Sequence, residues 1–215
     1  MTLLDLFRKA FQAVTLGDVT LPGLWHLAKG LARGTFYILW YRSTRRNVVI
    51  RFPFMAYAPV RIYGKGSVFI DERCSVFYSV FRGLTIMTLT PEARVSIGKG
   101  CDLGGLTIRC CKEVSLGDKV MTAVSLVQDT PIVHDGATPA RHPGANWCKP
   151  VSIGDKVWLA ASSAVLQGAS IGEESVLSVG SCIMGQAAPG RSLLVGNPVR
   201  RPVLIERILG LRKNA

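Results

Sequence analysis

Aliphatic residues return at every sixth position in the C-terminal third of the chain. The series consists of Ile153, Leu159, Val165, Ile171, Leu177 and Ile183. A period of six fits neither an amphipathic helix nor an ordinary hairpin, but it suits a coil in which short strands and turns repeat in fixed steps. We therefore predict an all-β solenoid, a parallel β-helix, in which each aliphatic side chain points inward and stacks on its counterpart one coil away.

A second series of small or β-branched residues lies four positions after the first. Its members are Val157, Ser163, Ala169, Ser175, Ser181 and Ala187. We expect these residues where the chain turns a corner, because a larger side chain would not fit there. The same texture begins more loosely at about Val48, so the region has room for several complete turns at three steps per coil.

The rhythm stops after Val127 and resumes at Ile153. The intervening residues 128–150 contain four prolines and two glycines, a composition that favours turns over repeated strands. We predict that they form an excursion loop out of the coil. Loops mounted on a rigid scaffold are frequent places for functional sites.

Amphipathic segments flank the repeats. Residues 2–15 predict a helix with one apolar face, and residues 24–41 predict a second helix that is rich in aromatic side chains and followed by Arg42, Arg45 and Arg46. Such helices lie in a bilayer interface or cap the open end of a solenoid, and the sequence leaves both interpretations open. The predicted organisation is residues 1–47 as N-terminal amphipathic helices, residues 48–200 as the β-helix with excursion loop 128–150, and residues 201–215 as a short C-terminal helical tail.

One segment resembles a known family. Residues 149–201 read KPVSIGDKVWLAASSAVLQGASIGEESVLSVGSCIMGQAAPGRSLLVGNPVRR. The tandem repeats, the KPV-I-GD-VW opening and the GNP-R ending resemble the hexapeptide-repeat acyltransferases of the left-handed parallel β-helix type, in particular CoA-dependent O-acetyltransferases of sugars and surface polysaccharides. The resemblance implies left-handed winding, direct acetyl transfer without an acyl-enzyme, and a homotrimer with CoA bound between neighbouring β-helices.

Charge, cysteine usage and the N-terminal sequence limit the binding partners and the cellular location that we expect. The formal net charge of +12 favours anionic partners such as CoA phosphates or phospholipid headgroups, while no nucleic-acid-binding motif is present. The six cysteines show no paired framework, so we predict reduced core thiols. The N-terminus lacks the features of a signal peptide, and we expect a cytoplasmic protein, with the inner face of the membrane as an alternative location.

Acetyl transfer to a hydroxyl requires a general base, because an alcohol is a weak nucleophile near neutral pH. The chain has three histidines, of which His26 lies in a predicted helix while His134 and His142 lie in the excursion loop. The resemblance places the base just before the KPV segment and after an acidic residue. His134 is therefore the predicted base, with Asp129 or Asp135 as the residue that orients its ring, and His142 is the alternative.

The sequence disfavours two other kinds of catalytic site, a zinc centre and a nucleophilic cysteine. A zinc site of the kind that β-helix carbonic anhydrases use needs three histidines, which the coil positions do not supply. No cysteine is accompanied by an activating base, so a nucleophilic thiol is disfavoured. We predict no metal cofactor.

The resemblance also predicts contacts with acetyl-CoA. Trp158 matches an aromatic position at the mouth of the site, and the arginines after Gly196-Asn197-Pro198 match basic positions near CoA phosphates. Backbone amides are candidates for the oxyanion of the tetrahedral intermediate and for the pantetheine path. The predicted contacts are Trp158, Ala160, Ala161, Ser178, Val179, Arg200 and Arg201.

The sequence therefore favours an acetyl-CoA-dependent O-acetyltransferase that acts on a sugar hydroxyl of a surface polysaccharide or glycolipid precursor. Two alternatives stay open. One is N-acetylation of an amino sugar, since the sequence does not separate the two acceptor types. The other is a non-catalytic β-helix that docks at a membrane through its N-terminal helices and organises partners.

Overall fold

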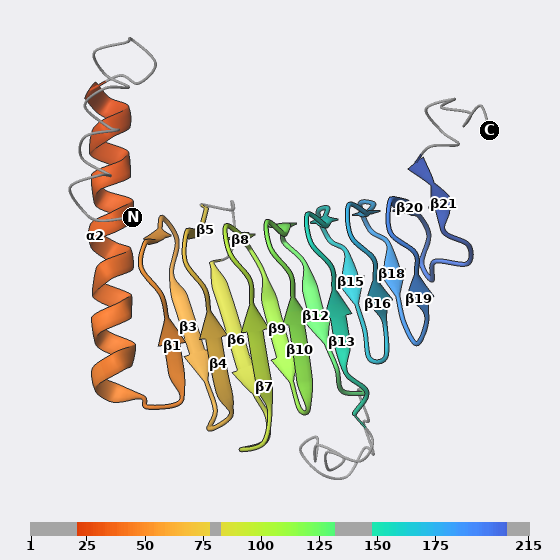
Figure 1. The fold of residues 1–215 in the computed structure, drawn as a ribbon, viewed down its shortest axis with the longest axis horizontal. Helices are drawn as coiled ribbons and strands as arrows, with labels where there is room; N and C mark the ends of the chain where they lie inside the picture. Colours follow the sequence, from red (N-terminus) through yellow and green to blue (C-terminus); the bar gives the residue numbers. More distant parts are fainter. Residues whose placement is uncertain (1–20, 78–82, 132–147, 206–215) are drawn as a thin grey trace.

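The protein folds as a β-solenoid of about six turns with a helix at its N-terminal end (Figure 1). The computed structural model describes residues 21–77, 83–131 and 148–205. Successive strands alternate among three sheets, and from β1 to β20 each strand pairs in parallel with the strand three places away in the chain. Only β21 departs from this order among the described strands. This topology confirms the predicted parallel coil.

The three sheets form the three sides of the coil. The first contains β1 (Val48–Ile50), β4 (Ser67–Ile70), β7 (Arg94–Ile97), β10 (Glu113–Leu116), β13 (Val151–Ile153), β16 (Ser170–Ile171) and β19 (Ala187–Ala188). The second contains β2 (Phe54–Ala56), β5 (Cys74–Val76), β8 (Asp102–Gly104), β11 (Met121–Ala123), β14 (Trp158–Leu159), β17 (Val176–Leu177), β20 (Ser192–Leu194) and β21 (Val203–Leu204). The third contains β3 (Val60–Tyr63), β6 (Leu84–Thr88), β9 (Thr107–Cys110), β12 (Leu126–Gln128), β15 (Ala164–Val165) and β18 (Cys182–Ile183).

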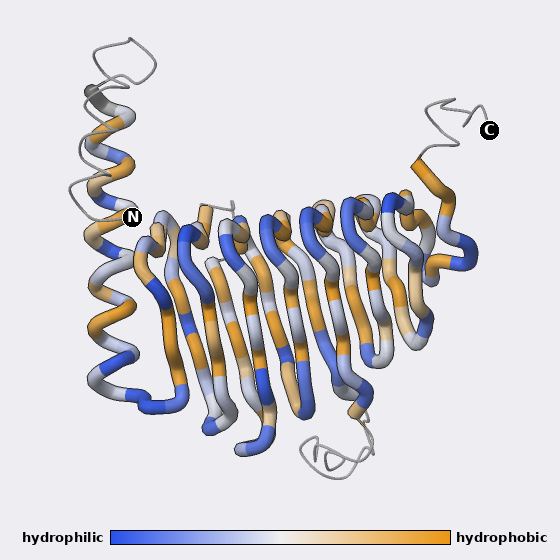
Figure 2. Tube along the Cα trace, viewed as in Figure 1, coloured by the Kyte–Doolittle hydropathy of each residue, from blue (hydrophilic) through white to orange (hydrophobic). Residues whose placement is uncertain are grey.

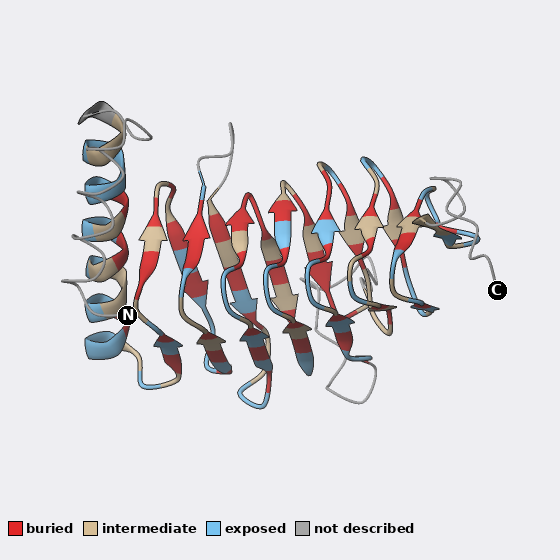
Figure 3. Ribbon diagram, turned by 45° about the horizontal axis from the view of Figure 1, so that its top comes forward, coloured by how far each residue is buried: buried red, intermediate tan, exposed pale blue. Residues whose placement is uncertain are grey.

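The six-residue aliphatic series forms the core. Ile153 pairs with Ile171 on the first side of the coil, and Leu159 pairs with Leu177 on the second. All six members of the series are buried, with at most 3% of their surface exposed. Buried positions alternate with accessible ones along the strands (Figure 3), whereas hydrophilic residues gather at the turns (Figure 2). The predicted stacking of inward aliphatic side chains is confirmed.

The corner series holds with one exception. Val157, Ser163, Ala169, Ser175 and Ser181 are buried, as their small size predicted. Ala187 is exposed instead, because Ile171 pairs with Ala188 and Ser170 pairs with Ala187. The last coil is therefore one residue short at this point, and the inward position falls on Ala188.

The helix α2 (Leu21–Thr44) packs on the first coil. A Cβ atom at Gly34 would overlap the carbonyl oxygen of Phe54, so only glycine allows this close approach of helix and strand. The Tyr41 hydroxyl donates to the carbonyl of Val60 at 3.2 Å and accepts from the amide of Ile62 at 3.0 Å. The helix thus caps the end of the coil. The helix predicted for residues 2–15 lies outside the described residues.

The C-terminal segment differs from the predicted helix at two residues. Val203 and Leu204 form β21, which pairs antiparallel with β20, rather than the start of a helix. The turn between them contains the cis Asn197–Pro198 peptide bond and a bridge between Gly196 and Val199. A short antiparallel strand satisfies the polar edge of β20 that the last coil would otherwise leave open. Residues 206–215 lie outside the described part of the chain.

Candidate functional site

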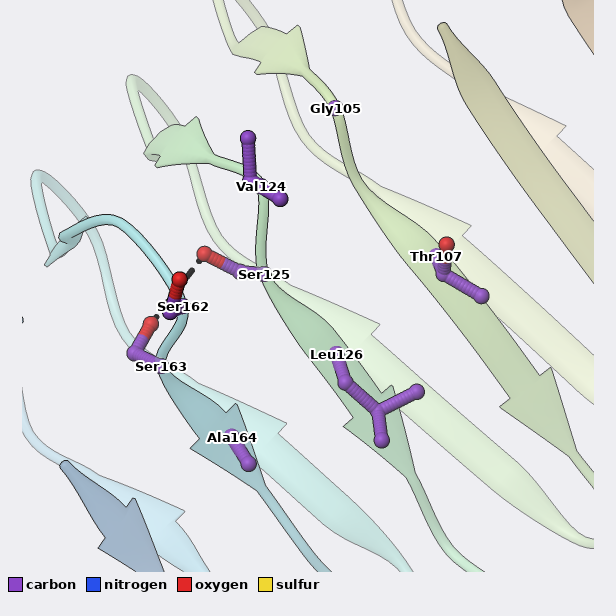
Figure 4. A pocket seen from close by; sticks show the side chains of 8 residues that line it. All are labelled: Gly105, Thr107, Val124, Ser125, Leu126, Ser162, Ser163 and Ala164. Carbon is purple, nitrogen blue, oxygen red and sulfur yellow. Dashed lines mark hydrogen bonds between the residues drawn. The ribbon is translucent and has the colours of Figure 1, made fainter. Parts of the chain in front are cut away.

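A pocket of about 310 Å³ opens at the corner between the second and third sheets (Figure 4). Thr122 pairs with Leu159 and Leu126 pairs with Ala164, so the corner of the later coil is one residue longer. The pocket spans the coils on both sides of this change. Its lining residues are Gly105, Thr107, Val124, Ser125, Leu126, Ser162, Ser163 and Ala164.

Two serines join the coils beneath the pocket. The hydroxyl oxygens of Ser125 and Ser163 lie 3.1 Å apart (Figure 4), and both residues are buried. The Ser125 hydroxyl also lies 3.3 Å from the carbonyl oxygen of Leu159. These hydroxyl groups are engaged within the wall, whereas Ser162 is exposed at the rim. Ser125 and Ser163 therefore fix the spacing of the two corners and leave Ser162 as the accessible hydroxyl.

The coil hydrogen bonds divide the four predicted backbone contacts into two pairs. The amide of Ala160 donates to the carbonyl of Leu177, and the amide of Ser178 donates to the carbonyl of Leu194, both at 2.9 Å. Within the described residues, the amides of Ala161 and Val179 have no hydrogen-bond acceptor. An oxyanion donor must be free to turn toward the substrate. Of the four backbone amides, those of Ala161 and Val179 are thus the ones available to a ligand, and the contacts of all four residues with acetyl-CoA stay predictions.

Val124 occupies a strained backbone conformation in the pocket wall. Its φ is +53°, a region that β-branched residues rarely adopt. The preceding corner has Gly105 at +67°, the next has Ser162 at +58°, and the one after that has Gly180 at +67°. We expect Val124→Gly to stabilise the protein by about 1 kcal/mol, because relief of this strain exceeds the entropic cost of glycine. Thermal unfolding of the purified variant measures the change.

The matched control is Val49→Gly. Val49 is a half-exposed valine in β1 that is not among the positive-φ residues. It should lose roughly 0.5 to 1 kcal/mol. A Val124→Gly variant that melts as low as the control would show that the corner is not strained.

Trp158 lies on the outer surface of the second sheet, with 48% of its surface exposed. Met121 and Val176 are its register partners on the neighbouring strands, and Leu193 follows one strand further. These four side chains form an apolar stripe along the coil axis. The stripe runs beside the corner that carries the pocket, since Trp158 begins the strand that leads into Ala160 and Ala161.

The carboxylate of Asp129 is bound by backbone amides of another coil. Its carboxylate is fully buried and accepts the backbone amides of Cys111 at 2.6 Å, Lys112 at 2.6 Å and Glu113 at 2.7 Å. Its carbonyl accepts the amide of Lys149 at 3.0 Å, which joins the two ends of the excursion loop. Asp129 thus connects the preceding coil, through its carboxylate, to the end of the excursion loop, through its carbonyl oxygen.

The predicted base, His134, lies in the excursion loop outside the described residues. His134, Asp135 and His142 lie outside the described residues, so their roles stay predictions. His26 is exposed on α2, at the end of the coil stack that the first turn occupies. Arg200 and Arg201 are both exposed and are separated from β21 by Pro202.

The cysteines are core residues, as predicted. All six are free thiols, and five of them are buried. Burial raises the pKa of Cys111 to about 12, and it also raises the pKa of Cys110 and Cys182. These thiols therefore stay protonated at neutral pH and are poor nucleophiles. In the described ranges, no cluster of three metal-ligating side chains occurs.

Comparison with solved structures identifies the fold. The polysialic acid-specific acetyltransferase NeuO is 19% identical over 73% of this chain and 70% of its own, with a TM-score of 0.51. The polysialic acid O-acetyltransferase OatWY is 15% identical over 73% of both chains, with a TM-score of 0.53. Galactoside acetyltransferase in complex with coenzyme A is 18% identical over 84% of each chain, with a TM-score of 0.41. The chain has the fold of the hexapeptide-repeat acetyltransferases.

Sequence-level comparison adds nothing to this identification. No protein-family model matches the chain, and no curated protein sequence is similar to it. The hexapeptide-repeat fold is thus recognised through its coil geometry and through the short motifs of residues 149–201.

The sequence does not predict Asp102 as a residue of the surface beside Trp158. Asp102 is the register partner of Met121, at the start of the stripe that contains Trp158. Burial raises the pKa of its carboxyl group, and its Oδ1 atom has no hydrogen-bond partner. A lone aspartate before an inward leucine gives no signal in the sequence, because aspartates are common at the turns of such coils.

Proposed function

We propose that the protein is an acetyl-CoA-dependent O-acetyltransferase that acts on a sugar hydroxyl of a surface polysaccharide or glycolipid precursor. The observation that carries the proposal is the corner pocket with the uncommitted amide of Ala161 at its edge and the exposed Trp158 one strand earlier. The solved structures of NeuO and OatWY, with TM-scores above 0.5, are a polysialic acid-specific acetyltransferase and a polysialic acid O-acetyltransferase, which supports a sugar polymer as the acceptor class.

In the proposed reaction, the neutral imidazole of His134 removes the proton of the sugar hydroxyl. The oxygen attacks the thioester carbonyl, and the amide of Ala161 donates to the oxyanion that forms. Collapse of the tetrahedral intermediate breaks the carbon–sulfur bond, and the imidazolium returns the proton to the CoA thiolate. The acetyl group passes directly to the acceptor without an acyl-enzyme, and Asp135 is the residue proposed to orient His134.

The proposed assembly is a homotrimer of left-handed β-helices with acetyl-CoA in the groove between neighbours. The apolar stripe of Met121, Trp158, Val176 and Leu193 supports it, because an exposed apolar row is typical of a surface that contacts a partner. Each site would then use two subunits. The proposed location is the cytoplasm, with the inner face of the membrane as the alternative.

Thiol release from acetyl-CoA tests the proposal. Purified full-length protein should release CoA in the presence of polysialic acid or a related soluble or lipid-linked glycan, and the product should lose its acetyl group in mild alkali because esters hydrolyse under these conditions. An acetyl group that resists alkali would support the alternative of N-acetylation. Failure to bind CoA, together with no thiol release for any sugar, would instead favour the non-catalytic scaffold.

Charge reversal of Arg200 and Arg201 tests the predicted contact with CoA. We expect Arg200→Glu with Arg201→Glu to raise KM for acetyl-CoA by about tenfold with little change in kcat, because these side chains would interact with the phosphates and not with the reacting atoms. The matched control reverses Lys99 and Lys112, two exposed lysines on other coils. An unchanged KM in the arginine variant would assign both residues to a solvated basic tail.

A further inference from the structure

The side of α2 that is turned away from the coil carries large apolar side chains. Gly30, Gly34 and Tyr41 face the first coil, so positions half a helical turn away from them face outward. Trp25 is 62% exposed, and Trp40 is 53% exposed. We define the outer α2 face by its accessible residues, which recur at steps of three and four: Trp25, Lys29, Ala32, Phe36, Leu39 and Trp40.

The helical rings on this face contact one another and a cation. Phe36 and Trp40 stack with ring centroids 6.1 Å apart, and the ammonium group of Lys29 lies 5.0 Å from the ring of Trp25. Both arrangements leave the rings on the surface of the helix. An exposed aromatic row of this size is uncommon on a helix that faces only water, where charged and polar residues normally occupy the outer side.

The surroundings of the outer α2 face are strongly basic. Residues 21–70 contain eight lysines and arginines and no aspartate or glutamate. Arg42 and Arg46 are exposed at and just beyond the C-terminal end of the helix. Aromatic side chains at the headgroup level, with cations around them, are the combination that binds a helix to the interface of an anionic bilayer.

We propose that the outer α2 face docks the protein on the surface of a bilayer that contains anionic phospholipids. In the described ranges, no helix is long and apolar enough to cross a membrane, so α2 would lie in the plane of the interface. The helix runs across the end of the coil stack, with its accessible side away from the strands (Figures 1 and 3). Docking through this face stands the solenoid on its N-terminal end and directs the corner pocket and later coils away from the lipid.

Charge complementarity selects the bilayer over another protein as the occupant. A protein partner would need an acidic groove to match the basic surroundings of one helix, whereas an anionic bilayer supplies negative charge over the whole end of the solenoid. The proposal does not depend on acetyl transfer. Activity toward a soluble acceptor should be the same in the docking variants as in the native protein, since none of the altered residues lies in the pocket or its coils.

Vesicle co-sedimentation of the full chain tests the proposal. The protein should bind vesicles of equimolar phosphatidylglycerol and phosphatidylcholine at low salt, and it should bind vesicles of phosphatidylcholine alone at least tenfold more weakly. Trp25→Ser, Phe36→Ser and Trp40→Ser together should lower partitioning into the anionic vesicles by more than tenfold. Arg42→Gln with Arg46→Gln should lower it by about fivefold for each cation removed.

Two controls make the result decisive. Met184→Ser removes an apolar side chain with 55% exposure from another coil, and Lys99→Gln with Lys112→Gln removes two cations from other coils. Neither should change vesicle binding, and circular dichroism should show that every variant is folded. Equal binding to both kinds of vesicle, or unchanged binding of the aromatic variant, would overturn the proposal. A change of oligomeric state in the aromatic variant, seen by light scattering, would also overturn it and assign the face to a protein contact.

Discussion

Replacing His134 by alanine should lower kcat for acetyl transfer by about 10²- to 10⁴-fold while KM for acetyl-CoA changes little. The size of the effect is that of general-base catalysis, because an unassisted sugar hydroxyl keeps its proton near neutral pH. CoA binding involves other residues in the proposed site, so the loss should appear in the chemical step. Steady-state kinetics with acetyl-CoA and a fixed acceptor measure both constants.

The other two histidines supply the controls. His142→Ala should retain most of the activity, and His26→Ala should retain all of it, since His26 is exposed on α2. Unimpaired transfer by the His134 variant would remove this residue from the mechanism. If the His142 variant were the inactive one, the base would be the second loop histidine, and the remainder of the proposed reaction would stand.

The inward face of the coil is the part of the fold that the sequence predicts best. Ile153, Leu159 and Val165 each occupy a buried position that repeats once per strand, so one period of six describes three sheets at once. The prediction weakens where a coil gains or loses a residue. The corner after Leu159 is one residue longer than the corner after Thr122, and small side chains at both corners hide this difference in the sequence.

The candidate site is predicted less well because part of its chemistry resides in the backbone. Ala160 and Ala161 are indistinguishable as side chains, yet only the amide of Ala160 is engaged by the next coil. The corrected C-terminal strand has a similar origin. Val203 and Leu204 fit one face of a short helix as well as they fit a strand, and the open edge of β20 decides between the two.

Asp129 illustrates how a candidate residue can have contacts that the sequence does not reveal. Its position shortly before His134 made it a candidate to orient the base, and its neighbours in the sequence gave no other partner. The groups that bind its carboxylate lie 16 to 18 residues earlier in the chain, on the preceding coil. Such contacts depend on the coil register, which the loose phase before the excursion loop does not define.

Replacing Asp129 by alanine should therefore destabilise the fold, by about 3 to 5 kcal/mol. The substitution leaves three backbone amides without an acceptor in a site that excludes water, and each unsatisfied buried donor costs roughly 1 to 3 kcal/mol. For a chain of this length, the melting temperature should fall by about 10 °C. Thermal unfolding followed by circular dichroism measures the loss.

Asp118→Ala is the matched control. Asp118 also accepts a backbone amide from a neighbouring coil, that of Lys99 at 2.8 Å, but it is exposed to water. Its loss should cost less than about 1 kcal/mol, since water replaces the missing acceptor. Asp129→Asn separates the two roles, because the side-chain amide keeps one acceptor oxygen for the backbone amides but no negative charge for an imidazolium. An asparagine variant that keeps most of its stability and loses kcat would return Asp129 to the catalytic machinery, whereas a shared loss of stability in both variants, with kcat retained below the melting temperature, assigns it to the base of the loop.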